Sequence, residues 1–115
     1  SRHGERSARH DALQRVMRYV REHLHEDMSL QEAAAAAMLS PNYLANLLKK
    51  QTDRTFTELV TERRIEQAKE LLLVSGATIG AVAAQCGFRD ADYFSRRFRQ
   101  QVGLTPRAFR DKNRI

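Results

Sequence analysis

The strongest constraint on the fold is that this 115-residue sequence contains one helical hairpin motif twice. The segment SLQEAAAAAML (29–39) aligns with TIGAVAAQCGF (78–88), and the match resumes after one extra residue in the second copy. Each copy predicts a short alanine-rich helix, a tight turn and a second helix, because small alanines let two helices approach closely. Two unrelated helix pairs in a bundle are the alternative, but they would not explain why caps, apolar positions and basic ends all align.

Helical periodicity extends over almost the whole chain. Apolar residues recur at helical spacing from Leu13 to Leu24, and capping Ser or Thr residues precede several later segments. No segment alternates strictly enough to predict a strand. We therefore predict an all-α fold of seven helices, at about 10–26, 29–37, 41–52, 56–74, 78–85, 90–101 and 105–112.

These helices predict two helix-turn-helix subdomains, at 10–55 and 75–112, joined by a long linker helix at 56–74. Residues 1–9 are polar and aperiodic, so we expect a disordered tail or cloning remnant there, and a second short tail at 113–115. A linker helix of this length would span about 28 Å. That is close to one turn of duplex DNA, about 34 Å, so two reading helices could reach successive major grooves.

Charge is concentrated at one end of the chain. The net charge is +6, and residues 89–115 alone carry eight basic and three acidic side chains. A basic segment on a nearly neutral body indicates a polyanionic partner, although a basic soluble surface is the plainer reading. One cysteine and no apolar run of membrane-spanning length favour a reducing, cytoplasmic setting without a membrane partner.

The second helix of each hairpin presents an outer face opposite its buried stripe. In 41–52 this face holds Asn42, Ala45, Asn46 and Lys49, and in 90–101 it holds Ala91, Asp92, Ser95, Arg96 and Arg99. Arg pairs with guanine, Asn with adenine, and small residues leave room for a thymine methyl, so we predict base contacts in a major groove. Asn42 has an alternative role at the start of its helix, and Asp92 could either complement a helix N-terminus or accept from cytosine N4.

A second set of residues has the chemistry of phosphate contacts, which position a protein on DNA without reading sequence. Cations near the two hairpins, and two threonines that cap helices whose N–H groups could face phosphates, form this set. They are Lys49, Lys50, Arg54, Thr55, Arg97, Arg99, Thr105 and Arg107.

RIEQAKELL (64–72), followed by TIGAVAAQCGFRDADYFSRRFRQQVGLTPRAFR (78–110), resembles the DNA-binding domain of the AraC/XylS family of bacterial transcription regulators. The resemblance covers about residues 10–112 and is looser in the first hairpin. It implies the same seven-helix fold, with a monomer placing two recognition helices in adjacent major grooves of an asymmetric site. The family's base-reading positions fall on Asn42, Ala45, Asn46, Ala91, Asp92, Ser95 and Arg96.

The resemblance also implies a nucleoid-associated activator whose upstream sensing or receiver domain is absent here, with RNA polymerase as a further partner. Met38 and Asp53 depart from the family pattern, because glycine is common at both positions. We expect Met38 to fill space in the core, with a possible shift of the first recognition helix.

Other classes of protein remain as alternatives. A DNA-repair enzyme could carry this module beside a catalytic domain outside the chain, and a helical protein-interaction domain is a third reading. No motif pairs a nucleophile with a base, and His23 and His25 lie on different helical faces, so we expect no catalysis, metal or cofactor. Cys86 is expected to be a buried apolar residue of the second turn.

Overall fold

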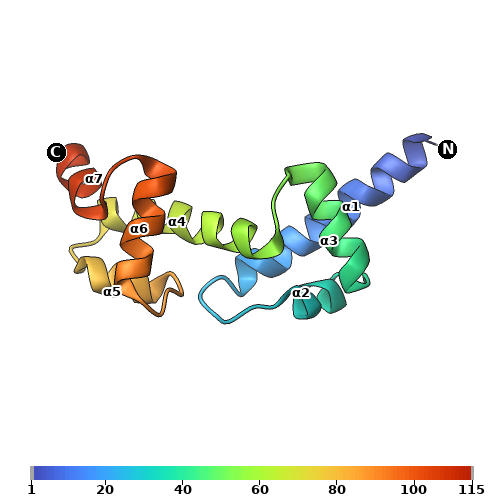
Figure 1. Cartoon of the computed structure of the whole chain (residues 1–115), viewed down its shortest axis with the longest axis horizontal. Helices are drawn as coiled ribbons and strands as arrows, with labels where there is room; N and C mark the ends of the chain where they lie inside the picture. The colour runs from blue at the N-terminus through green and yellow to red at the C-terminus, as the bar shows by residue number, and fades with distance from the viewer. Residues whose placement is uncertain (1, 115) are drawn as a thin grey trace. The chain divides into compact units, whose positions relative to one another are not determined.

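The computed structural model describes residues 2–114, and side chains from residue 4 onward. Among these residues it contains seven α-helices and no strand, which confirms the predicted fold class. Figure 1 shows their order along the chain. The helices are α1 (Arg2–Glu22), α2 (Leu30–Ala36), α3 (Pro41–Thr52), α4 (Phe56–Val74), α5 (Ile79–Gln85), α6 (Ala91–Val102) and α7 (Pro106–Asn113).

The first helix differs from its prediction at both ends. It begins at Arg2, so the expectation of a disordered tail over residues 1–9 is wrong for residues 2–9. The exposed residues there give no apolar signal, but most are good helix formers that simply extend the helix. At the other end the helix stops at Glu22, where the His23 ring stacks on Tyr19 and its Nδ1 lies 2.9 Å from the Tyr19 carbonyl oxygen. Ser1 and Ile115, at the ends of the predicted tails, lie outside the described residues.

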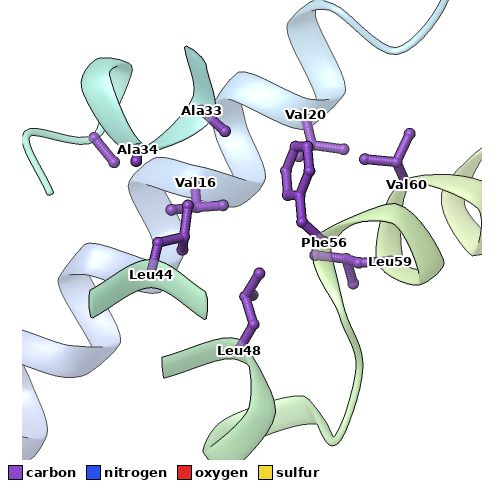
Figure 2. Close-up of a cluster of buried hydrophobic side chains, with 10 residues drawn as sticks. Val16, Val20, Ala33, Ala34, Leu44, Leu48, Phe56, Leu59 and Val60 are labelled. Atoms are coloured by element: carbon purple, nitrogen blue, oxygen red, sulfur yellow. The ribbon is translucent and has the colours of Figure 1, made fainter. Parts of the chain in front are cut away.

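The chain divides into two compact units, residues 1–60 and residues 61–115. The core of the first unit is drawn in Figure 2, where Val16 and Val20 of α1 face side chains from α2, α3 and α4. Leu44 and Leu48 of α3 are fully buried in it. The stripe predicted from Leu13 to Leu24 packs on this core, with Leu24 in the turn that follows α1.

The core of the second unit is built in the same way around aromatic rings. Phe94 and Phe98 of α6 are fully buried, with ring centroids 5.7 Å apart, and Phe98 also meets Phe109 of α7 at 5.6 Å. Val82 and Ala83 supply the face of α5.

Helix α4 belongs to both cores, which the predicted linker did not anticipate. Its first turns bury Phe56, Leu59 and Val60 in the first unit, while Ile65 and Leu72 are buried in the second. The division between units therefore falls inside α4, between residues 60 and 61, and not at its ends.

The two hairpin turns have the same backbone geometry. In the first, the Leu39 N–H donates to Ala34 and the Met38 N–H donates to Ala35; in the second, Phe88 and Gly87 repeat these bonds to Ala83 and Ala84. This pair of bonds requires a left-handed residue just after the first helix.

Met38 (φ 62°) and Gly87 (φ 92°) occupy that left-handed position in the two turns. The expectation that Met38 fills the core is wrong, because its side chain is 87% exposed.

Candidate nucleic-acid interface

Helix α3 is fixed at both ends by local chemistry. The Ser40 hydroxyl accepts from the Tyr43 N–H at 3.1 Å, and Pro41 takes the first helical position, where no N–H is needed. The helix ends at Asp53, whose backbone is left-handed at φ 58°. Gly103 ends α6 in the same conformation, so the position where glycine was expected does require left-handed geometry.

The predicted base-contacting residues of α3 all lie outside its core. Asn42, Ala45 and Asn46 are exposed, while Leu44 and Leu48 between them are fully buried. Since Ser40 caps the helix, Asn42 is not needed for that purpose. The described structure gives neither asparagine side chain a hydrogen-bond partner, which leaves both amides available to a ligand.

Helix α6 starts with a cap that the sequence reading missed. Asp90 lies just before the helix, and its carboxylate accepts from the N–H groups of Asp92 at 2.9 Å and Tyr93 at 3.4 Å. An aspartate immediately before an amphipathic helix is the signal that could have found it. With Asp90 in this role, the carboxylate of Asp92 is exposed in the first turn and is not the cap.

The outer face of α6 matches that of α3 in exposure. Ala91, Asp92 and Arg96 are exposed and Ser95 is half-buried, opposite the buried Phe94 and Phe98 of the same helix. Asp92 and Arg96 are one turn apart, yet no ion pair joins them among the described residues. Each hairpin thus exposes hydrogen-bonding side chains at corresponding positions of its second helix.

The candidate phosphate contacts of the first unit differ in their present partners. Lys49 is 3.5 Å from the Asp53 carboxylate, whereas Lys50 is exposed and has no side-chain partner among the described residues. Arg54 is half-buried. Thr55 forms a capping box with Glu58, which lies one turn into α4: its hydroxyl accepts from the Glu58 N–H, and its own N–H donates to the Glu58 carboxylate at 3.2 Å. These hydrogen bonds lower the pKa of the Glu58 carboxyl.

The second unit leaves its corresponding helix end open. Thr105 caps α7 by accepting from the Ala108 N–H at 3.1 Å, and no acidic residue lies in the first turn of this helix. Arg99 and Arg107 are exposed. Arg97 is half-buried, and its Nη1 donates to the Gln100 side chain at 3.0 Å while its Nε is buried without a partner.

Two further arginines form hydrogen bonds at helix ends that were not predicted from the sequence. Arg15 of α1 donates from Nε to the Ala37 carbonyl at 3.1 Å, at the end of α2. Arg110 of α7 donates to the carbonyls of Leu72 at 3.0 Å and Ser75 at 3.3 Å, at the end of α4. Both satisfy carbonyl groups that a helix end leaves without intrahelical donors.

The described cysteine and histidine side chains form no metal site. Cys86 is fully buried in the second core, and burial raises the pKa of its thiol to about 11, against the opposing charge of Arg64. Among the described residues no group of three His, Cys, Asp or Glu side chains could hold a metal ion. None of the described helices is both long enough and apolar enough to span a bilayer.

Comparison with known proteins agrees with this geometry. The profile of a family described as "Helix-turn-helix domain" matches residues 33–112. The regulatory protein PocR of Salmonella typhimurium is 36% identical over 104 residues, which are 90% of this chain and 34% of PocR. This chain therefore spans about a third of the length of that curated relative.

Two solved structures share both fold and sequence. The DNA-binding domain of AdpA, a global transcriptional factor solved in complex with a target DNA, is 31% identical with a TM-score of 0.78, covering 84% of this chain and 87% of that one. The C-terminal domain of AraT, a response regulator from Geobacillus stearothermophilus, is 30% identical with a TM-score of 0.82, covering 90% and 87%. With two capped hairpins, two exposed outer faces and these matches, the chain belongs to the AraC-type helix-turn-helix family and is a DNA-binding domain of the kind found in transcription regulators.

Proposed function

We propose that this chain reads double-stranded DNA with the outer faces of α3 and α6, each in a major groove. The observation that supports the proposal is that the same outer face is accessible on the second helix of both hairpins. Both helices bury their apolar stripe and leave the predicted base-contacting positions exposed or half-buried, and the polar groups there have no hydrogen-bond partner among the described residues.

The side chains on these faces divide the reading between them. Arg96 suits guanine, because its guanidinium can donate to O6 and N7 together, and Asn42 and Asn46 suit adenine N6 and N7. Asp92 suits the N4 amino group of cytosine, since its carboxylate would repel a phosphate. The small residues of the two faces let the helices approach the bases: Ala45, Ala91 and Ser95.

Phosphate contacts then fix the position of each helix without reading sequence. The candidates are Lys49, Lys50, Arg54, Thr55, Arg97, Arg99, Thr105 and Arg107. Because the residues of the two faces differ, the two half-sites would differ, so a single chain would bind an asymmetric site in two successive major grooves. The AdpA domain, which was solved with its target DNA, supports this use of the fold.

In the full-length protein the domain would be the output part of a cytoplasmic transcription regulator, acting on DNA without catalysis and most simply as an activator that contacts RNA polymerase. An upstream sensing or receiver domain would control it. The length of PocR, of which this chain spans a third, and the origin of the AraT domain in a response regulator support such an arrangement. The relatives named above give no comparable support to a repair enzyme or a protein-interaction bundle.

The test is selection of bound duplexes from a random pool, followed by Arg96→Ala on the selected site. We expect a loss of about 1–3 kcal/mol and relaxed preference at one or two base pairs. Lys50→Ala is the contrasting variant: it should weaken binding evenly on all sequences and reduce the salt slope by about one. Equal weakening by Arg96→Ala on every sequence would assign Arg96 to a phosphate. Binding that is absent, or independent of salt, would favour the protein-interaction reading.

A further inference from the structure

The N-terminal turns of α1, which extend beyond the predicted start of the helix, form one wall of a groove along α3. The groove has a volume of about 380 Å³ and lies entirely within the first unit. Glu5 and Arg9 line it from α1, and Tyr43, Asn46 and Lys50 line it from α3.

Two cations, Arg9 and Lys50, line this groove. Arg9 and Lys50 are exposed, and neither side chain has a hydrogen bond or ion pair among the described residues, in contrast to Lys49 with its partner Asp53. The carboxylate of Glu5 also lines the groove, yet it is not paired with Arg9 although the two are one helical turn apart. A phosphate in the groove would be attracted by both cations, against the repulsion of the single Glu5 carboxylate.

The groove is continuous with the surface of α3 that we assign to base reading. Asn46 lines the groove and also lies on the outer face with Asn42, so the groove runs along one flank of the recognition helix. A helix lying in a major groove has the sugar–phosphate backbones on its two flanks. We propose that this groove receives the DNA backbone, and that Arg9 is a phosphate contact which the extended α1 adds beside Lys50.

This inference rests on the proposed DNA binding by α3, but it is a separate claim about α1. From the sequence, Arg9 is expected in a disordered tail, and the matched helix-turn-helix profile begins only at residue 33. Neither of these therefore indicates a role for Arg9 in binding DNA.

The experiment compares Arg9→Gln with Arg18→Gln in the whole chain. Arg18 is also exposed on α1, and nine residues, about two and a half turns, place it on the opposite face of the helix. Both variants remove one positive charge from the same helix, so a difference between them reports the groove. Affinity is measured by fluorescence anisotropy over a range of KCl concentrations, on a duplex selected from a random pool and on an unrelated duplex of equal length.

Each released counter-ion contributes about 0.9 to the slope of log K against log salt, so Arg9→Gln should weaken binding about eightfold at about 0.1 M salt and lower the slope by about 0.9. The loss should be equal on both duplexes. Arg18→Gln should change affinity by about twofold or less, since an exposed charge remote from the duplex is screened. Arg9→Lys keeps the charge and should keep the slope. Circular dichroism melting should show all three variants folded, as expected for exposed positions.

Equal effects of Arg9→Gln and Arg18→Gln would overturn the inference, as would a changed base preference in Arg9→Gln. If Arg96→Ala still relaxes base preference in that case, the proposed function stands and only the groove assignment fails. A wild-type chain that binds neither duplex would instead remove the proposed function, and the groove assignment with it.

Discussion

Met38→Gly should stabilise the first unit. Met38 holds a left-handed backbone at φ 62°, which costs a residue with a side chain about 1–2 kcal/mol relative to glycine. The side chain is 87% exposed, so its removal sacrifices little packing. Against this gain, glycine lowers the free energy of unfolding by about 0.4–1 kcal/mol, because it gives the unfolded chain more conformational freedom. The net gain is about 0.5–1 kcal/mol, or about 2–8 °C in the melting temperature of a unit of this size.

The assay is urea and thermal unfolding followed by circular dichroism, with amide hydrogen exchange to assign the change to residues 1–60. Met38→Ala is the matched control: it removes the same side chain but keeps the backbone strain, so stability should be unchanged. Gly103→Ala is the reverse test, because at φ 91° an added Cβ meets no atom within 4 Å. The backbone cost of about 1–2 kcal/mol, less the same unfolded-chain contribution, leaves a net loss of about 0.5–1 kcal/mol. A loss of stability in Met38→Gly, or an equal gain in Met38→Ala, would refute the argument from backbone strain.

Three further predictions concern buried or bonded groups. Burial raises the pKa of the Cys86 thiol to about 11, so only about a thousandth of it is thiolate at pH 8. Ellman's reagent should therefore react with Cys86 at the rate at which the protein unfolds. Rapid reaction with the native protein would contradict the burial of this thiol. Arg110→Lys keeps the charge but loses the hydrogen bonds to two carbonyls at the end of α4, so it should lower the free energy of unfolding in urea by about 1–3 kcal/mol. Arg107→Lys is the control and should not change it measurably. Equal losses in the two variants would refute the role of these hydrogen bonds. The pKa of the Glu58 carboxyl is lowered from 4.5 in the folded state, so the carboxylate stabilises the fold above pH 4.5 and this effect is lost as pH falls through the lowered pKa. Glu58→Gln should therefore reduce the dependence of stability on pH in the acid range. An unchanged pH dependence would contradict the capping box.

Most of the fold could be predicted because helix boundaries are local. Ser40 and Thr105 predict helix starts because each hydroxyl caps a backbone N–H only a few residues further on. The structure places α3 and α7 directly after them. The extension of α1 could not be found in this way, because its residues 4–9 pack against no core and so carry no apolar period. The division inside α4 was hidden for a different reason: Phe56 and Ile65 are both apolar and buried, and only the folded chain shows that they belong to different cores.

The arginines show most clearly where sequence reasoning stops. Arg96 and Arg110 lie in one basic segment, and composition alone treats both as candidates for DNA. In the folded chain Arg110 donates to two carbonyls at the end of α4, whereas Arg96 is exposed on α6 with no partner among the described residues. A guanidinium has five donors in a fixed plane, so one that already bridges two carbonyls has little freedom to turn toward a base or phosphate. The number of basic residues therefore overstates the number of DNA contacts. A better estimate excludes each cation that bonds to carbonyls at a helix end, as Arg110 does. It includes each cation that lines a surface beside α3 or α6, which is the basis of the proposal for Arg9.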